Sequence, residues 1–207
     1  MSKSKTKTRI PQQQRSIQTK KQIIDAAMKL FSEKGFHATN SKEIAKEAGV
    51  ATGCFYSYFT DKKAVFIEAL KIYFEEFGFI FQEHVAKLKN EHLDKKDFLK
   101  GLVMSILEAH HVFTDFHNEL TVMYYSDPEI LKLIDEFEKN SIQFTLEYLK
   151  EAQEQLKVTD LEAASVVVFR SVHSIVDAVV FYKKKELEQR LVEELVDMVI
   201  RYLFGDL

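Results

Sequence analysis

The stretch that decides the fold is S-K-E-I-A-K-E-A-G-V-A-T-G-C-F-Y-S-Y-F-T-D-K, which runs from Ser41 to Lys62. Asn40 or Ser41 can cap a short helix here, and Glu43 falls at the third helical position if Asn40 is the cap. Gly49 ends this helix, because glycine adopts the left-handed backbone conformation of a sharp turn at low cost. The segment therefore predicts a short helix that ends in a tight turn.

A second short helix is expected directly after the turn, from about Thr52 to Tyr58, and Asp61 can cap the helix that follows. Its apolar positions face inward, and small or polar residues remain on the outer face: Thr52, Gly53, Tyr56 and Ser57. Two short helices joined by a glycine turn form a helix-turn-helix, whose second helix fits the major groove of DNA. Hydroxyls, a phenol and a bare glycine suit contacts to phosphates and base edges.

This pattern resembles the DNA-binding domain of the tetracycline-repressor (TetR) family of bacterial transcriptional regulators. The resemblance covers Thr19 to Phe66, and it lies in I-A, A-G-V, G, Y-x-Y-F and a following capped lysine at fixed spacing. It implies phosphate contacts by Ser41, Tyr56, Tyr58 and Lys62, with Thr52 and Gly53 facing the bases. The sequence departs from the commonest family pattern at Thr52, often a basic residue, and at Ser57, often a ring. These departures leave the operator sequence open.

Charge is distributed unevenly along the chain, although the net charge of the 207 residues is only -3. Residues 1–60 hold 11 Lys or Arg against 4 Asp or Glu, whereas the remaining residues hold 18 against 28. A basic amino-terminal part on an acidic remainder fits a protein that presents one end to a polyanion.

Three parts are predicted along the chain: a basic flexible arm at 1–18, a helix-turn-helix domain at 19–65, and a ligand-binding and dimerisation domain at 66–207. The first part carries five basic residues, no acidic residue and few apolar ones. Such a segment is either a solvated tail or an arm that follows the DNA backbone or enters the minor groove.

The predicted fold class is all-α, with about nine helices. The chain has only two prolines, Pro11 and Pro128, so nearly every residue has a backbone N–H that a helix can use. Apolar residues also recur at helical spacing. Besides the two short helices, the expected ranges are 19–34, 61–90, 94–111, 114–125, 127–156, 160–183 and 186–204. The resemblance implies that the long fourth helix connects the DNA-binding part to the rest of the chain.

The last two predicted helices are candidates for a subunit interface. The helix over 161–182 is apolar nearly all round, and the last helix is amphipathic. Such helices can form a four-helix interface with their copies in a second subunit, or they can close the core of a monomer. The resemblance favours a homodimer that pairs through these two helices.

The resemblance also implies a cavity for a small, largely apolar effector, although no motif identifies its walls. Aromatic residues are the candidates, with plain core packing as the alternative: Phe77, Phe113, Tyr124, Phe144, Tyr148 and Phe169. Arg170, His173 and Asp177 share one stripe of an apolar helix. A buried arginine needs an acidic partner on another helix or an anionic ligand, so Arg170 and His173 join the candidates.

Other classes of protein have weaker support. One short stretch contains several possible metal ligands: His110, His111, Asp115, His117 and Glu119. His111 and Asp115 are four residues apart, a spacing that metal ligands can have on a helix. The sequence has no phosphate-binding glycine loop and no nucleophile motif, so we expect no enzyme and no cofactor. The lone Cys54 excludes an internal disulfide, and it is either a redox-sensitive thiol or a small residue near DNA.

The start of the chain lacks the apolar run of a secretory signal, and no stretch is expected to be long enough to span a bilayer. The expected location is therefore the cytoplasm, without a membrane partner. The expected function is a ligand-responsive regulator that binds double-stranded operator DNA, most simply a repressor released by its effector. An architectural DNA binder without a ligand, and a helical metal protein or enzyme, are the alternatives.

Overall fold

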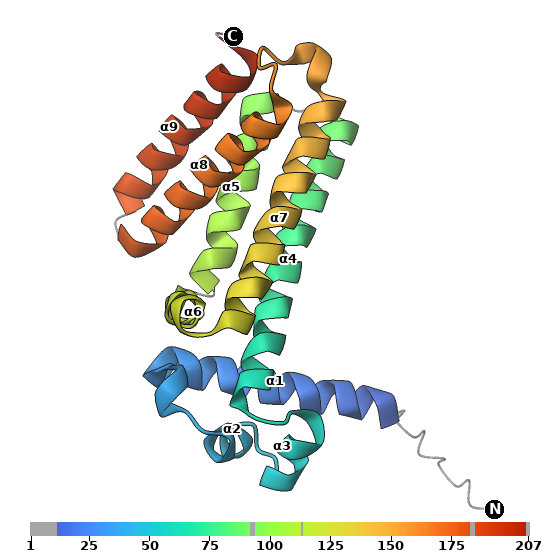
Figure 1. Cartoon of the computed structure of the whole chain (residues 1–207), viewed down its shortest axis with the longest axis vertical. Helices are drawn as coiled ribbons and strands as arrows, with labels where there is room; N and C mark the ends of the chain where they lie inside the picture. The colour runs from blue at the N-terminus through green and yellow to red at the C-terminus, as the bar shows by residue number, and fades with distance from the viewer. Residues whose placement is uncertain (1–11, 92–93, 113, 183–184, 206–207) are drawn as a thin grey trace, which may run out of the picture. The chain divides into compact units, whose positions relative to one another are not determined.

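The computed structural model of the protein describes residues 12–91, 94–112, 114–182 and 185–205. Within these ranges the chain forms nine α-helices and one short 3-10 helix, and no strand (Figure 1). The chain divides into two compact units, Met1–Lys71 and Ile72–Leu207, which we call the head and the body. The prediction of an all-helical fold is confirmed.

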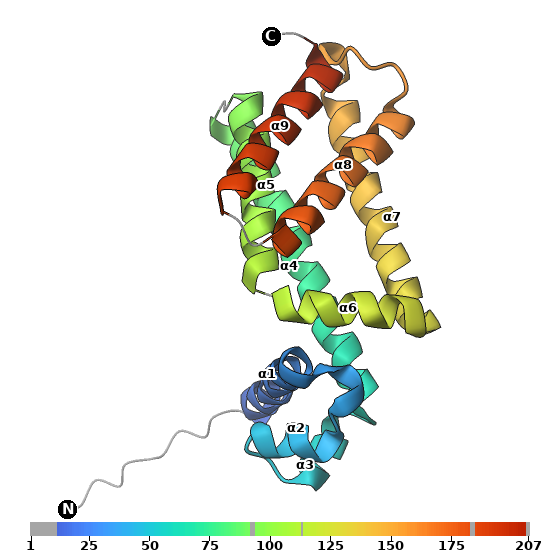
Figure 2. The same cartoon turned by 90° about the vertical axis from the view of Figure 1, so that its left-hand side faces the viewer.

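The head contains α1 (Gln12–Ala38), α2 (Ser41–Glu47), α3 (Thr52–Tyr58) and the first turns of α4 (Lys62–Glu91). Both short helices lie on the same side of α1 (Figures 1 and 2). Helix α1 begins before the expected Thr19, because glutamine and arginine at its start are good helix formers. Residues 12–18 of the predicted arm are thus helical, and residues 1–11 lie outside the described residues.

Three phenylalanine rings form the centre of the head. Phe31, Phe36 and Phe66 contact one another pairwise, with ring centroids 5.4–5.5 Å apart. Apolar residues from all four helices surround them and are buried: Ile23, Ala27, Ile44, Ala45, Phe55, Phe59, Val65, Ala69 and Leu70. The periodic apolar positions of the sequence therefore converge on one small core.

The body contains the rest of α4 together with α5 (Lys95–Val112), α6 (Thr114–Ser126), α7 (Pro128–Glu151), η1 (Gln153–Gln155), α8 (Leu161–Tyr182) and α9 (Lys185–Phe204). Helix α8 packs against α5, α7 and α9, and α6 crosses the direction of α5 and α7 (Figure 2). Asp127 caps α7 ahead of Pro128, as the sequence predicts. Helix α7 ends earlier than the predicted residue 156, and η1 follows it.

The core of the body lies between α5, α8 and α9. Its buried residues are mostly aliphatic: Leu99, Leu102, Val103, Leu107, Val176, Val179, Val180, Val192, Leu195, Val196, Val199, Ile200 and Leu203. Aliphatic residues can replace one another in a core of similar volume. Their pattern in the sequence therefore predicts a helical bundle, but it does not predict which residues contact each other.

Helix α8 corrects one expectation. Its window Leu161–Val180 has a mean hydropathy of 1.6, so by length and composition alone it is long and apolar enough to cross a membrane. The expectation that no stretch reaches that length is therefore wrong. The core helix of a globular protein passes the same test, and α8 packs against three helices of the body.

Candidate nucleic-acid interface and effector cavity

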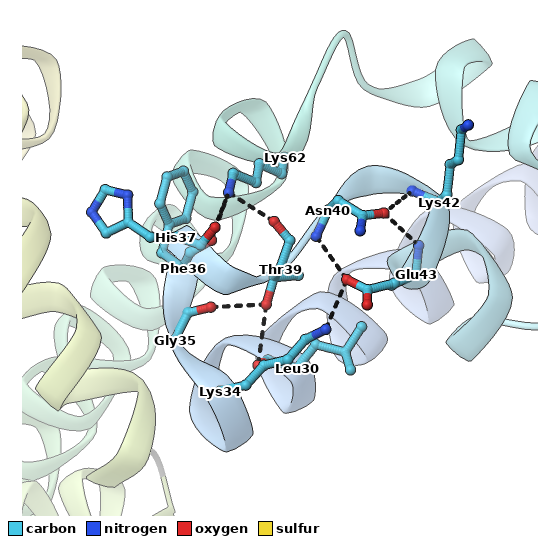
Figure 3. Close-up of polar contacts among 10 residues, drawn as sticks. All are labelled: Leu30, Lys34, Gly35, Phe36, His37, Thr39, Asn40, Lys42, Glu43 and Lys62. Carbon is cyan, nitrogen blue, oxygen red and sulfur yellow. Dashed lines mark hydrogen bonds and ion pairs between the residues drawn. The ribbon is translucent and has the colours of Figure 1, made fainter.

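The start of α2 is fixed by a capping box. The Asn40 side-chain oxygen accepts hydrogen bonds from the amides of Lys42 and Glu43, at 3.0 and 3.1 Å. The Glu43 carboxylate accepts one in return from the Asn40 amide at 3.0 Å, and it also contacts the Lys34 ammonium at 2.7 Å (Figure 3). The hydrogen bond from Lys34 and that from the Asn40 amide lower the pKa of Glu43. Of the two caps the sequence allows, Asn40 is the one used.

The turn after α2 has the geometry that the sequence predicts. Gly49 has a φ of 68°, in the left-handed region that glycine adopts without strain. The amide of Gly49 donates to the Lys46 carbonyl and the amide of Val50 donates to the Ala45 carbonyl, at 3.1 and 2.9 Å. These bonds satisfy carbonyls at the end of α2 and direct the chain into α3.

Helix α3 has one buried side and one open side. Phe55 and Phe59 are buried in the head core, whereas the Tyr56 side chain is 53% exposed. Gly53 is exposed, and a Cβ placed there would meet no atom within 4 Å. Thr52 and Tyr58 are half-buried, as is Ser41 at the start of α2. The predicted contact residues of α3 therefore include an accessible phenol and an open stretch of backbone.

Lys62 differs from these residues, because its ammonium is occupied inside the head. It donates hydrogen bonds to the carbonyls of Phe36, His37 and Thr39, at 2.7, 3.2 and 2.7 Å, and lies 4.5 Å from the Phe36 ring centre (Figure 3). Burial lowers the pKa of Lys62, and the nearby Glu43 charge opposes this shift. No sequence signal marks these acceptors, since they are backbone atoms more than 20 residues away.

Thr39 lies beside the Lys62 ammonium, in the connection between α1 and α2, and no sequence pattern singles it out. The residue is 1% exposed, and its hydroxyl donates to the carbonyl of Gly35 at 2.8 Å and lies 3.3 Å from that of Leu30. Gly35 itself has a φ of 84°, which breaks the helical conformation inside α1. Thr39 and Lys62 therefore donate to main-chain carbonyls at and just after this break: Thr39 to that of Gly35, and Lys62 to those of Phe36, His37 and Thr39.

The body contains a cavity of about 770 Å³ between its helices. Seven predicted ligand-binding residues line it: Phe77, Tyr124, Phe144, Tyr148, Phe169, Arg170 and His173. The eighth, Phe113, lies outside the described residues. Sequence reasoning missed other lining residues, among them Tyr73, Phe74, Phe98, His110, Phe137 and Asp177. A helical pattern does not distinguish an aromatic side chain that faces a cavity from one that faces the core.

Two ion pairs lie along the cavity wall formed by α8. Arg170 makes a bidentate pair with Glu138 of α7, with nitrogen to oxygen distances of 2.9 and 2.6 Å. An acid on another helix is thus the partner of Arg170, as one of the two alternatives has it. The expected burial of Arg170 is wrong, because its side chain is 54% exposed. His173 Nδ1 lies 3.0 Å from the Asp177 carboxylate. Burial lowers the pKa of His173, but the hydrogen bond and charge of Asp177 outweigh burial and raise it above its ordinary value.

One end of the cavity contains buried polar groups among aromatic rings. His110 is 5% exposed, and its Nδ1 lies 2.9 Å from the Ile106 carbonyl. Its ring contacts the rings of Tyr73 and Phe77. Burial, with a smaller effect of the Asp177 charge, raises the pKa of the Tyr73 phenol.

Some of the residues that could form a metal site have side chains that the structure does not describe. The described residues contain no group of three or more His, Cys, Asp or Glu side chains that could hold a metal ion. The side chains of His111, Asp115 and His117 are not among the described ones.

Comparison with known protein families matches most of the chain. Residues 23–69 match the model of the bacterial regulatory proteins of the tetR family, and residues 96–203 match that of the tetracyclin repressor-like C-terminal domain. The regulator AcrR of Shigella flexneri is 33% identical over 96 residues, 46% of this chain and 43% of AcrR. The fatty acid metabolism regulator protein of Bacillus subtilis is 31% identical over 97 residues, 47% of this chain and 46% of that protein. The matches thus span less than half the length of these two relatives.

Solved structures are similar over nearly the whole chain. The fatty acid degradation regulator FadR from Bacillus halodurans has a TM-score of 0.69 at 26% identity, over 94% of this chain and 97% of that one. NalD of Pseudomonas aeruginosa, the secondary repressor of the MexAB-OprM multidrug efflux pump, has a TM-score of 0.68 at 20% identity. That comparison covers 93% of this chain and 100% of NalD, and at this identity it shows the fold alone.

Proposed function

The chain belongs to the TetR family of bacterial transcriptional regulators, and from this premise we propose that it is a repressor released from its operator by a small, largely apolar effector. The observation that carries the proposal is the pairing of two features. The head presents an open face on α3, and the body contains a cavity with many aromatic residues in its walls. A regulator that responds to a ligand needs both.

For the head, we propose that α3 lies in the major groove, with Thr52 and Gly53 facing the bases. Ser41, Tyr56 and Tyr58 then contact phosphates. The exposure of Tyr56 and the open backbone at Gly53 support this assignment. The family resemblance implies the same role for Lys62, but in the free head its ammonium already donates to three carbonyls.

For the quaternary structure, we propose a homodimer that pairs through α8 and α9. Large apolar side chains on these helices are exposed in the single chain: Val166 at 43%, Val167 at 45%, Met198 at 48% and Tyr202 at 39%. A second copy would cover this surface and form an isologous four-helix interface. Two heads would then read two half-sites about one turn of DNA apart, ~34–36 Å. Operator binding also implies a cytoplasmic location.

For the effector, we propose a molecule with a long apolar part. The cavity volume is in the range of small-molecule sites, and its walls are mainly aromatic and aliphatic. Two relatives carry names that refer to fatty acid metabolism or degradation, so a fatty acid derivative is the first effector to test. The cavity also weighs against an architectural DNA binder, which has no use for one.

Release would follow from geometry. If the effector binds better to a body that holds the two heads at another spacing, operator affinity falls by the coupling free energy, typically ~1–3 kcal/mol. Helix α4 is the continuous element for this coupling, because it contributes residues to both units.

A selection experiment tests this function and does not require a known operator sequence. The full chain is used to select binding sequences from a pool of random DNA duplexes, and palmitic acid and palmitoyl-CoA are then added to the bound operator. We expect enrichment of a two-fold symmetric sequence and release by at least one of the two compounds. Absence of any enriched duplex would reject the DNA-binding function. Enrichment without release would reject only the proposed effector.

A further inference from the structure

We propose that Lys62 is a positioning residue: its ammonium fastens the first turn of α4 to the carboxyl end of α1 and thereby holds α2 and α3 in the geometry that DNA recognition needs. Its effect on DNA binding rests on the function proposed above. The fastening itself is a property of the free head. The role differs from the direct phosphate contact that the family resemblance implies.

Every hydrogen-bond donor of the Lys62 side chain has a partner inside the head. A lysine ammonium has three N–H groups and no acceptor. Lys62 Nζ lies within hydrogen-bonding distance of three carbonyl oxygens, those of Phe36, His37 and Thr39. A phosphate could therefore be bound only at the expense of one of these bonds.

The electrostatic setting of Lys62 also favours these carbonyls. Lys62 is the first residue of α4, where the amide dipoles of the helix make a positive side chain unfavourable. Asp61 offsets part of this, since its carboxylate accepts a hydrogen bond from the Ala64 amide at 2.8 Å. The remaining compensation comes from the three main-chain carbonyls that accept hydrogen bonds from the ammonium, all of which follow the break at Gly35. The ammonium therefore joins the positive end of α4 to a cluster of main-chain carbonyls at residues 36–39.

The Lys62 junction lies between the head core and the start of α2. The ammonium lies over the ring of Phe36, which packs against Phe31 and Phe66 in the head core. Its acceptor Thr39 directly precedes Asn40, the residue that caps α2. Loss of the ammonium would leave three carbonyls without this partner at the point where α2 begins. The start of α2, and α3 beyond it, would then be less well fixed.

The discriminating substitution is Lys62→Met, which removes the charge and keeps an apolar stem over Phe36. The matched control is Lys42→Met, at an exposed lysine of α2. Affinities are measured at several salt concentrations for the selected operator and for a random duplex of about 30 base pairs. We expect Lys62→Met to retain the salt slope on random DNA and to lose about tenfold in preference for the operator, whereas Lys42→Met retains that preference. If Lys62→Met instead keeps its preference for the operator, and its plot of log affinity against log salt concentration is shallower by about 0.9, Lys62 contacts a phosphate.

A second measurement needs no DNA, and so separates this inference from the proposed function. Amide hydrogen exchange is compared between the natural chain and Lys62→Met. We expect exchange over residues 35–44 to accelerate by about tenfold, with α7 in the body unchanged as an internal control. Unchanged exchange over residues 35–44 would overturn the fastening role. Should the natural chain bind no duplex at all, the proposed function fails and the exchange result still decides the role of Lys62.

The natural chain also offers a check that does not depend on a variant folding. Lysine labelled with 13C at Cε gives an NMR signal for each ammonium-bearing side chain. On addition of the random duplex at low salt, we expect the Lys62 signal to keep its position while signals of lysines that contact phosphates shift. A Lys62 shift among the largest of the head would contradict the proposal.

Discussion

The head and the body are both helical, but different forces define their geometry. In the head, single polar groups fix the connection from α1 to α2 and the start of α4, as at Asn40, Thr39 and Lys62. In the body, many aliphatic and aromatic side chains pack around a cavity, and most of them have substitutes of similar volume. The geometry of the head therefore depends on a few individual residues, whereas that of the body depends on many interchangeable ones.

The largest expected effect comes from replacing one phenylalanine by alanine in each unit, which tests whether the two cores are packed differently. Phe31 is fully buried in the head core, whereas Phe77 lines the cavity and is half-buried. We expect Phe31→Ala to reduce the free energy of unfolding of the head by about 3–5 kcal/mol, because it opens a void in a filled core. Phe77→Ala should cost the body about 1–2 kcal/mol, since part of its ring already borders empty space. Urea unfolding followed by hydrogen exchange in each unit measures both. Equal costs would contradict the difference in packing.

The second largest effect concerns function and should be confined to the head. Tyr56 is 53% exposed on α3, and Tyr125 of the body is 83% exposed. Replacement of Tyr56 by Ala should weaken binding about tenfold on any operator, because the contact proposed for Tyr56 is to a phosphate, which carries no sequence information. Tyr125→Ala is the control and should bind as the natural chain does. A gel-shift titration compares them, and unchanged affinity in Tyr56→Ala would count against the assignment.

A smaller effect is expected from the cap of α2. Asn40→Ala removes the acceptor for two amides, and should lower the stability of the head by about 1 kcal/mol. The same substitution at Asn140, an exposed residue inside α7, should change stability by less than about 0.5 kcal/mol. Thermal unfolding of the two variants tests the comparison. A cost at Asn140 equal to that at Asn40 would show that the head does not depend on its caps.

The smallest effect is a pH dependence of the body. The pKa of His173 is raised in the folded chain, because Asp177 and the charge of Glu138 outweigh burial and the charge of Arg170. Stability from the protonated pair is therefore fully present below the ordinary value of 6.5, and is lost as the pH rises through the folded pKa. Unfolding of the body measured across neutral pH should show this decline, and Asp177→Asn should abolish it. A body that gains stability over this range would contradict the assignment.

The sequence predicts more of the local structure of the head than of the body. In the head, the turn at Gly49 follows from one residue with a strong backbone preference, and the cap of α2 is narrowed to Asn40 or Ser41, of which Asn40 is used. The bounds of α3 follow from its apolar spacing, since α3 has no side-chain cap at its start. In the body, helical periodicity predicts the helices. For Arg170 the sequence allows an acid on another helix or an anionic ligand, and the structure has Glu138 beside it. The bonds of Lys62 could not be predicted, because their acceptors are main-chain carbonyls. Likewise, periodicity cannot indicate that Phe137 faces a cavity.

The central claim is that α3 enters duplex DNA and that the body sets the spacing of two such helices. Sedimentation velocity of the full chain, alone and with a fluorescent duplex of the selected operator, tests this most directly. We predict a dimer in the absence of DNA and a complex of one dimer with one duplex whose half-sites are centred about 10–10.5 base pairs apart. A monomer that leaves the duplex sedimenting as free DNA at low salt would contradict this claim.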